Sequence, residues 1–311
     1  MKVLITGGGG FIGSHLADRL LAEDHEVLVI DNYSTGRRDN LSEQSGLTIV
    51  EDTIDDAAAV DAAFDGFEPE FVVHAAASYK DPDAWEQDVL TNALGTANVV
   101  RSAQRTGVGR LLYFQTALCY GTTPTEQPVT LDHPIRPDSS YAISKTAGEQ
   151  YIEMSGIDFL SFRLANAYGP RNISGPLPTF YHRLTEDKPV FVMDTRRDFI
   201  YVDDLIDVVR QAVVDGTGHG HYHVSSGSDF AIKELLDATL AALPEVDLDE
   251  QPEVRPKGED DAYTILLDPS RIQQDFGWSP KTPLTDGVRG AIDYYRERGI
   301  TQTYTHLKVG E

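Results

Sequence analysis

The chain has 311 residues, of which 50 are acidic and 26 basic, so its formal net charge is −24. That charge argues against nucleic acid and anionic membranes as partners, because both would repel the protein. With a single cysteine, no room for a signal peptide before TGGGG and no apolar run long enough to span a bilayer, we expect a soluble cytoplasmic protein without disulfides.

Short β-rich runs alternate with helical patterns through the first half of the chain. We predict strands at residues 3–5, 27–30, 48–50, 71–74, 111–114 and 159–162. Between them, an apolar helix stripe runs through residues 12–21, and residues 89–104 have the length of another helix. This alternation predicts an α/β fold, a Rossmann-type doubly wound parallel sheet that binds ligands at the carboxyl ends of its strands.

After about residue 165 the pattern loosens. Glycines and prolines interrupt YGPRNISGPLP, an apolar strand-and-helix run returns in DFIYVDDLIDVV, and helices are predicted near 231–243 and 284–298. We therefore expect a smaller C-terminal α/β substrate lobe, built from residues 166–196 and 217–311. The cofactor domain would comprise residues 1–165 with 197–216.

A glycine-rich turn, TGGGGFIGSHL at residues 6–16, links the first predicted strand to the first helix. Gly7, Gly10 and Gly13 are spaced three apart, which permits a tight turn and a close approach of the backbone to a pyrophosphate at the helix N-terminus. A flexible turn is the alternative for a glycine string alone. The strand before it, the amphipathic helix after it and an acidic residue at the end of the next strand together predict a dinucleotide site.

That acidic residue is Asp31, in VLVIDNYS. Its carboxylate is placed to accept hydrogen bonds from the adenosine ribose hydroxyls and to repel a 2′-phosphate, so NAD is predicted rather than NADP. Arg37 and Arg38 follow closely and keep NADP as an alternative. Asp52, after the third strand, is either an adenine-side contact or a simple turn aspartate.

Tyr141 and Lys145 lie four residues apart in SSYAISKTAGEQ, so on a helix both share one face. A tyrosine phenol has a solution pKa of about 10, and a neighbouring ammonium favours its phenolate. Lys145 is therefore expected to make Tyr141 a general acid/base and to reach a nicotinamide ribose. An ordinary surface helix turn is the alternative. Against it stands Thr116, at the carboxyl end of the fifth predicted strand, whose hydroxyl is placed to share the proton.

Together these motifs resemble the extended short-chain dehydrogenases/reductases, specifically the nucleotide-sugar epimerase/dehydratase family, over essentially the whole chain. The resemblance rests on TGGGGFIG, DN (31–32), HAAA (74–77), YAISKTAGE, RLANAYGPR, RRDFIYVDDL and FGWSPKTPLTDGV. FQTALCYG and YKDPDAW are similar to nucleotide-sugar epimerases of bacterial surface-polysaccharide clusters. The family resemblance implies that NAD is held by Gly7, Gly10, Phe11, Ile12, Gly13, Asp31, Asn32, Asp52, Thr53, Ala75, Ala76 and Lys145.

The residues after Thr116 distinguish members of the family. Dehydratases resemble Thr-Asp-Glu here and decarboxylases Thr-Ser-Glu, whereas this chain has Thr116, Ala117 and Leu118. The resemblance thus implies a 4-epimerase of a UDP-hexose or UDP-hexuronate. Tyr141, aided by Thr116, would take the proton of the 4-hydroxyl while the C4 hydride passes to NAD⁺, and the 4-keto sugar would turn over before the hydride returns. A nucleotide-sugar oxidoreductase or dehydratase, and a non-catalytic NAD-binding regulator, stay open.

On the substrate side, the resemblance implies that Asn166 holds the pyrophosphate, Arg197 binds a phosphate and Lys80 lies near the sugar diphosphate. The Arg-Pro-Gly-Asp stretch of the family corresponds to VRPKGEDDAY, with extra residues, so either Arg255 or Lys257 faces the substrate. The resemblance also implies a homodimer, formed through a four-helix bundle of the helix near 88–106 and the helix that carries the tyrosine and lysine.

The histidines of GHGHYHV (218–224) raise the question of a metal, since His221 and His223 would share one strand face. No carboxylate or cysteine in the sequence is spaced to complete a site, so structural histidines and no metal are predicted. His74, at the end of the fourth strand, is likewise expected to pack rather than to catalyse.

The net charge poses a question if the substrate is an anion. A few Arg and Lys side chains and a helix N-terminus would have to create a positive pocket inside an unfavourable overall field. The 32 aspartates and 18 glutamates against 8 lysines also suit a cytoplasm of high salt, where screening relieves self-repulsion; an ordinary acidic protein is the alternative.

Overall fold

Seven strands form the large sheet of the computed structural model, which describes residues 1–311 except 80, 249, 259–260, 301 and 305–311. The strands are β1 (Lys2–Thr6), β2 (Glu26–Ile30), β3 (Leu47–Val50), β4 (Phe71–His74), β5 (Arg110–Thr116), β6 (Asp158–Leu164) and β11 (Gly220–Val224). All pair in parallel, in the order β11-β6-β5-β4-β1-β2-β3. The strand order therefore reverses between β1 and β4, where a ligand site is expected.

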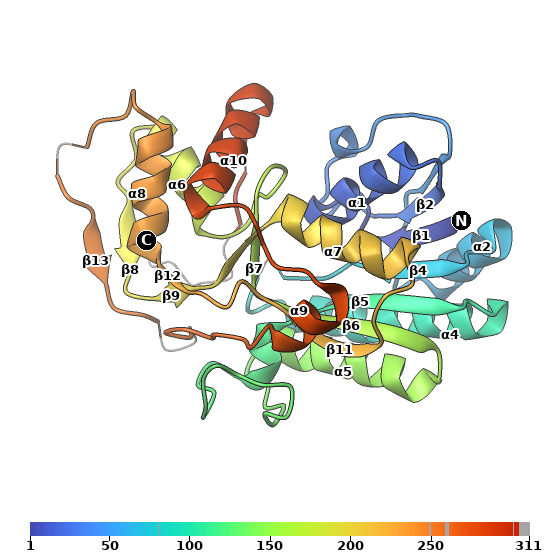
Figure 1. Ribbon diagram of the computed structural model, residues 1–311. Helices are drawn as coiled ribbons and strands as arrows, with labels where there is room; N and C mark the ends of the chain where they lie inside the picture. Colours follow the sequence, from blue (N-terminus) through green and yellow to red (C-terminus); the bar gives the residue numbers. More distant parts are fainter. Residues whose placement is uncertain (80, 249, 259–260, 301, 305–311) are drawn as a thin grey trace.

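Helices cover both faces of this sheet, which explains its continuous apolar strands. Successive side chains alternate between the faces: Val3 and Ile5 pack with one group of helices, and Leu4 with the other. Figure 1 shows α1 and α7 on one side of the sheet and α4 and α5 on the other. The first group is α1 (Phe11–Ala22), α7 (Val202–Val214) and α9 (Ser270–Phe276); the second is α2 (Ala57–Phe67), α4 (Thr96–Thr106) and α5 (Ser140–Ser155).

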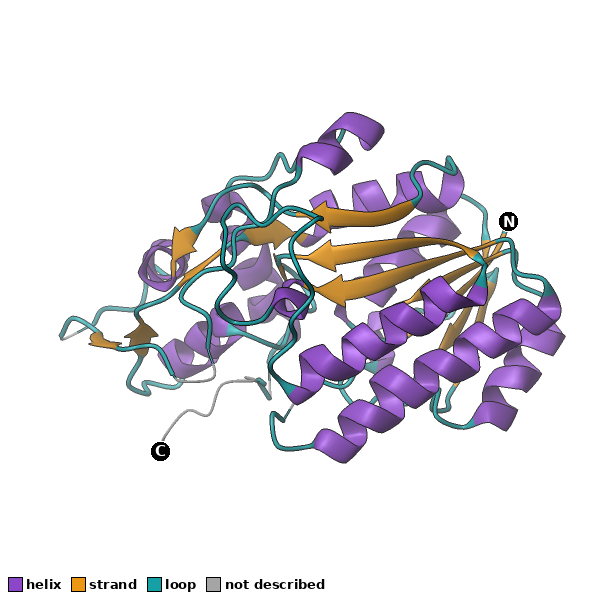
Figure 2. Ribbon diagram, turned by 90° about the horizontal axis from the view of Figure 1, so that it is seen from below, coloured by secondary structure: helices purple, strands orange, loops and turns teal. Residues whose placement is uncertain are grey.

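A smaller lobe faces the carboxyl ends of the strands of the large sheet. In Figure 2 the strand arrows of the large sheet point toward this lobe. Its core lies among α6 (Pro176–Thr185), α8 (Ile232–Ala242) and α10 (Leu284–Arg298). Its short strands pair two by two: β7 (Asn166–Tyr168) with β10 (Phe199–Tyr201), β8 (Phe191–Met193) with β13 (Glu253–Arg255), and β9 (Arg196–Arg197) with β12 (Phe230–Ala231). The lobe thus closes over the edge where the strands end.

The six strands predicted from the sequence are all present, as are the helices expected near 231–243 and 284–298. The suggested division of the chain does not hold for residues 220–224. It assigned them to the smaller lobe, whereas β11 is hydrogen-bonded to β6 as the edge strand of the large sheet. The histidines and glycine of this short strand hide the apolar pattern that marks the other strands.

None of the helices in the described ranges is both long enough and apolar enough to cross a membrane. The segment predicted as one helix over 89–104 has two parts. It follows the short α3 (Trp85–Asp88) as the π-helix η2 (Val89–Gly95) and then continues as α4. The wider turns of a π-helix re-aim the side chains along it, and such turns often lie at functional sites.

Candidate active site

A cavity of about 1530 Å³ opens where the carboxyl ends of β1, β4 and β5 face the smaller lobe. It gathers predicted residues from segments far apart in the sequence. Those that line it are Gly7, Gly10, Phe11, Ile12, Gly13, Asp31, Asn32, Asp52, Thr53, Ala75, Ala76, Thr116, Tyr141, Lys145, Asn166, Arg197 and Arg255. Lys80, which was also predicted, lies outside the described residues.

At two glycines of the glycine-rich segment, the neighbouring backbone comes so close that no side chain fits. Gly7 has a φ of +69°, and a Cβ there would lie 2.7 Å from the backbone of Ala76. A Cβ at Gly13 would lie 2.4 Å from the carbonyl oxygen of Gly7. The first residues of α1 line the cavity beside this turn. A dinucleotide pyrophosphate needs such a cradle at a helix N-terminus, so the residues present fit NAD.

The Asp31 carboxylate, at the end of β2, holds the glycine turn in place. Its oxygens accept hydrogen bonds from the backbone N–H groups of Gly9 and Tyr33, both at 2.7 Å. Burial raises the pKa of Asp31, and these amide contacts oppose the rise. The carboxylate lines the cavity, where it would meet a ribose.

The two arginines that kept NADP as an alternative cofactor both form ion pairs with carboxylates. Arg37 forms an ion pair with Asp39 at 2.6 Å. Arg38 pairs with Glu51 and lies 4.5 Å from the centre of the Tyr33 ring. These contacts leave the negative Asp31 as the charge at the ribose position, which favours NAD.

Two elements, α5 and β5, bring the predicted reacting groups together. Ser139 caps α5, accepting a hydrogen bond from the N–H of Ala142 at 3.3 Å, so that Tyr141 and Lys145 occupy the first two turns of the helix. Thr116 is the last residue of β5, and its hydroxyl oxygen accepts a hydrogen bond from Leu118 N–H at 3.2 Å. Thr116, Tyr141 and Lys145 all line the cavity.

Burial dominates the protonation of this pair. Burial lowers the pKa of Lys145 to about 7, and Glu149 opposes that fall. Burial also raises the pKa of Tyr141, as do the neighbouring Tyr79 and Asp88. Burial thus favours the neutral form of both groups in the chain by itself, and the expectation that Lys145 makes Tyr141 a general acid/base stays a prediction.

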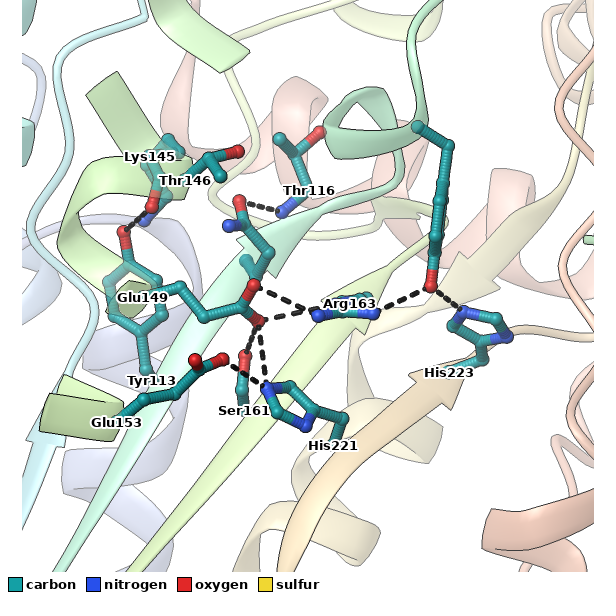
Figure 3. A network of polar contacts seen from close by, with 12 residues as sticks. Tyr113, Thr116, Lys145, Thr146, Glu149, Glu153, Ser161, Arg163, His221 and His223 are labelled. Carbon is teal, nitrogen blue, oxygen red and sulfur yellow. Dashed lines mark hydrogen bonds and ion pairs between the residues drawn. The ribbon is translucent and has the colours of Figure 1, made fainter. Parts of the chain in front are cut away.

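Behind the helix face of Tyr141 and Lys145 lies a buried polar network (Figure 3). Glu149 accepts hydrogen bonds from Arg163 Nε at 3.2 Å, Arg163 Nη2 at 3.0 Å and the Ser161 hydroxyl at 2.5 Å. Arg163 Nη1 donates to the Tyr120 hydroxyl at 2.8 Å, which in turn lies 2.6 Å from His223 Nε2. The partners come from α5, β6, the 3₁₀ turn η3 (Ala117–Tyr120) and β11, so no local spacing in the sequence indicated that they meet.

The histidine run does meet carboxylates, contrary to the sequence argument. His221 Nε2 lies 2.8 Å from Glu153 Oε1 and 3.7 Å from Glu149 Oε1, and the three side chains are close enough to share a cation. Both glutamates were missed because they lie about 70 residues away in the sequence. However, Glu149 is already paired with Arg163. A cation would have to bind beside that guanidinium, so the arrangement favours an ion-pair network.

The predicted phosphate-binding arginines carry carboxylate partners of their own. Arg197 forms an ion pair with Asp261 at 2.6 Å and is mostly buried. Arg255 pairs with the exposed Glu253 at 2.9 Å and lies 4.0 Å from the centre of the Phe191 ring. A phosphate entering this part of the cavity would therefore join or displace existing ion pairs.

The alternatives on the substrate side are placed as follows. Arg255 lines the cavity. Lys257 does not; its ammonium donates to the carbonyl oxygens of Gly258 and Asp261 at 3.3 and 3.1 Å. Asn166 Nδ2 donates to the Asp198 carbonyl oxygen at 3.2 Å. The structure therefore brings Arg255, rather than Lys257, to the candidate substrate pocket.

Asn92 is a residue that the sequence reasoning missed. It lies in the π-helix η2, where its amide bonds to Ser78 N–H at 2.8 Å, the Ser78 carbonyl oxygen at 3.1 Å and the Ser144 hydroxyl at 3.1 Å. Ser144 immediately precedes Lys145 on α5. The contact thus fixes the segment after β4 against the helix that carries the reacting pair.

The profile of the NAD dependent epimerase/dehydratase family matches residues 3–225, and the chain belongs to this family. The structure of the Bordetella bronchiseptica enzyme WbmH in complex with NAD⁺ superposes with a TM-score of 0.93 at 55% sequence identity, covering 96% of this chain and 99% of that one. Such a match places the family's NAD-binding fold in this chain, in agreement with the glycine cradle and Asp31.

Two further relatives carry information on the ligand. The Bordetella bronchiseptica enzyme WbmG, solved with NAD and UDP, is 43% identical with a TM-score of 0.91, and 99% of each chain is covered. The UDP-glucose 4-epimerase of Mycolicibacterium smegmatis is 31% identical over 96% of this chain and 99% of its own length. Curated relatives also include dTDP-glucose 4,6-dehydratase and UDP-glucuronic acid decarboxylases, so family membership alone leaves the reaction open.

Proposed function

We propose that the protein is an NAD-dependent nucleotide-sugar 4-epimerase that acts on a UDP-hexose or UDP-hexuronate through a transient 4-keto sugar. The observation that carries the proposal is the segment after Thr116. There the turn η3 (Ala117–Tyr120) offers no carboxyl group beside the reacting residues. Elimination of water by a dehydratase needs an acid and a base at the sugar carbons. Epimerisation at C4 needs a proton carrier only at the 4-hydroxyl, which Tyr141 supplies.

In this proposal Tyr141 takes the proton of the sugar 4-hydroxyl and later returns it, while the Thr116 hydroxyl orients the same oxygen. When bound, NAD⁺ would be held at the glycine turn and Asp31 and would supply a reversible hydride acceptor. The Lys145 ammonium favours the phenolate against the desolvation that burial imposes. The cavity of about 1530 Å³ exceeds the usual ligand pocket of roughly 300 to 1,000 Å³, as a site that holds both a dinucleotide and a nucleotide sugar requires.

UDP is proposed as the nucleotide because a relative of 43% identity was solved with NAD and UDP. Arg197 and Arg255 line the cavity in the smaller lobe and would pair with the diphosphate, with Asn166 beside them. Once a diphosphate displaces Asp261 and Glu253 from them, the two arginines would supply the local positive charge that an anionic substrate needs in a protein of net charge −24.

Proton NMR of the purified protein with UDP-glucose, UDP-glucuronate and their N-acetyl counterparts, without added NAD, tests the proposal. A new C4 coupling pattern that grows to a fixed ratio with one substrate is expected. It would support epimerisation, retained cofactor and substrate class together. Accumulation of NADH with added NAD and no new epimer would instead identify an oxidoreductase, and loss of water would identify a dehydratase.

Tyr141→Phe provides the matching variant, because it removes only the phenol oxygen. We expect turnover to fall by about 10³-fold or more while bound NAD is retained. Tyr151→Phe, on the exposed side of the same helix, is the control and should leave turnover unchanged. If Tyr141→Phe turned over normally, the proposed mechanism would be wrong. A non-catalytic NAD-binding regulator would show no turnover in any form.

A homodimer is part of the same proposal. Large apolar side chains are exposed on the two helical segments expected to form the interface: Trp85 and Val89 on α3 and η2, and Ile143, Tyr151 and Met154 on α5. Contiguous exposed apolar surface of this kind marks interaction sites. Light scattering should give twice the mass of the chain, and Val89→Arg with Ile143→Arg should give monomers. A monomeric parent protein would contradict the proposed dimer.

Cytoplasmic location and a role in polysaccharide biosynthesis stay predictions from the sequence.

A further inference from the structure

The Lys145 ammonium is buried beside an aromatic ring. Its Nζ lies 4.0 Å from the centre of the Tyr113 ring, and the Tyr113 hydroxyl donates to the Lys145 carbonyl oxygen at 3.0 Å. Among the described residues, no carboxylate lies within ion-pair distance of this ammonium. Burial lowers the pKa of Lys145 to about 7, so near neutral pH its charge is marginal. A lysine that is to stabilise the Tyr141 phenolate needs a group that holds its proton.

Glu149 is placed to be that group. It follows Lys145 by four residues on α5, so the two side chains lie on one face of the helix. Three hydrogen bonds from Arg163 and Ser161 fix its carboxylate. Figure 3 shows Glu149 between Lys145 and Arg163, which reaches it from β6 on the far side. The negative end of the Glu149–Arg163 pair therefore faces the lysine.

We propose that Glu149 is a positioning residue, a fixed anion one helical turn from Lys145 that favours the charged form of the lysine beside Tyr141. Glu149 is not among the residues that line the cavity, and it acts through Lys145 alone. The inference rests on the proposed function in one respect, namely that Tyr141 and Lys145 form the proton-carrying pair. Arg163 has two parts in this arrangement: it keeps the buried carboxylate ionised and holds it in one rotamer.

Other ionisable groups surround the pair, and most are held neutral. Burial lowers the pKa of His74 to about 3 and that of His223 to about 4, and burial raises the pKa values of the phenols and the thiol. Burial acts against Glu149 too, but Arg163 and Ser161 bring its pKa below the ordinary value. The groups that face Lys145 and Glu149 are Tyr141, Tyr113, His74, Arg163, His221, Tyr120, Cys119 and His223.

The direct test is the ionisation of Lys145 itself, read by the ¹³Cε shift of ¹³C-lysine-labelled protein with its cofactor bound. The eight lysines make assignment simple, because the Lys145 resonance is the one missing from Lys145→Arg. Glu149→Gln keeps the shape of the side chain and removes the charge. We expect its Lys145 midpoint to fall by about one pH unit or more, since loss of a nearby anion favours the neutral amine.

Glu153→Gln is the matched control. Glu153 lies one turn further on the same face of α5 and contacts His221, but it is exposed and no contact with Arg163 is found in the described residues. Its Lys145 midpoint should equal that of the parent protein. His221→Asn, introduced into Glu149→Gln and into Glu153→Gln, removes the histidine that lies between the two glutamates. Glu149→Asp keeps the negative charge, so its Lys145 midpoint should lie close to that of the parent protein.

Kinetics give a second, independent reading. In Glu149→Gln the alkaline limb of the kcat profile should move to lower pH, because the ammonium is lost earlier, while KM stays unchanged. A purely structural Glu149 would lower stability and leave both the limb and the NMR midpoint where they were, and that outcome would overturn the inference. Should no nucleotide sugar be turned over, the proposed function fails alone, since the NMR midpoint is measured without substrate.

Discussion

The two halves of the cavity differ in which groups line them, backbone in one half and side chains in the other. The cofactor half is made of backbone: the Gly7 turn, the first turn of α1 and the amides that hold Asp31. The substrate half is made of long side chains, chiefly Arg197 and Arg255, each already paired with a carboxylate. A backbone site is fixed before any ligand arrives. A side-chain site must exchange partners when an anion enters, so the two halves should respond differently to substitution, pH and salt.

The largest effect is expected on the backbone side, from Gly7→Ala. The added Cβ would meet the backbone of Ala76 at 2.7 Å in a residue whose φ is +69°, so neither neighbour is able to give way. We expect loss of bound NAD together with a destabilisation of several kcal/mol, measured by cofactor absorbance and urea unfolding. Gly66→Ala in α2 is the control: its Cβ meets open space, and it should stabilise by about 1 kcal/mol. A Gly7→Ala protein that still held NAD would show that the cradle is not rigid.

The next effect is on the side-chain half, from Arg197→Ala. Loss of a charge-assisted contact of about 1.5 to 3 kcal/mol should weaken UDP binding about 10- to 100-fold, measured by calorimetry, while bound NAD stays unchanged. Arg196→Ala is the matched control, because Arg196 shares the same short strand but pairs with Asp229 and lies outside the cavity lining. Equal losses of UDP affinity in Arg197→Ala and Arg196→Ala would mean that UDP binding depends on the conformation of the strand rather than on the Arg197 guanidinium.

These two halves also mark what the sequence could predict. Glycine spacing, strand ends and the helix N-terminus dictate backbone geometry locally, so Gly7, Gly13 and Asp31 were placed correctly in one cavity. Side-chain pairing depends on residues brought together by the fold. The Arg197–Asp261 pair spans 64 positions and the Tyr120–His223 contact 103. No local pattern carries such information.

The same limit applies to Tyr141. The sequence placed Tyr141 and Lys145 on one helix face, and both line the cavity. It could not indicate how strongly burial raises the pKa of Tyr141, because burial is a property of the whole fold. Glu149 was overlooked for a related reason: its partners Arg163 and Ser161 come from β6, and only the assembled sheet brings them to α5.

A smaller effect is expected on the pH dependence of stability, from two buried histidines on different strands of the large sheet, β4 and β11. His74 lies between Thr6 and Thr96 beside the cofactor half, with a pKa lowered to about 3 by burial. His223 on β11 has a pKa lowered to about 4, also by burial. Both are neutral when folded and protonate on unfolding below about 6.5, so each makes folding less favourable as pH falls toward its folded pKa.

We therefore expect the free energy of unfolding to fall between pH 7 and pH 5 by about 2 kcal/mol for each of the two histidines. His223→Asn should be less stable at pH 7, since it loses the Tyr120 contact, yet its stability should decline less steeply with acid. If the free energy of unfolding of His223→Asn fell with pH as steeply as that of the parent protein, His223 would not be a source of the acid sensitivity.

The smallest effect concerns salt, which should act in opposite directions on the fold and on the substrate half. The net charge of −24 is self-repulsive, so raising NaCl from about 0.02 to 1 M should raise the melting temperature by about 5 °C as the Debye length shrinks from about 20 to 3 Å. The same screening weakens attraction between the arginines and a diphosphate, so the Kd of UDP should rise about tenfold while NAD, held by backbone amides, stays bound. If UDP affinity were instead independent of salt, the positive pocket inferred within this acidic protein would be wrong, and recognition would rest on contacts to the uridine and sugar.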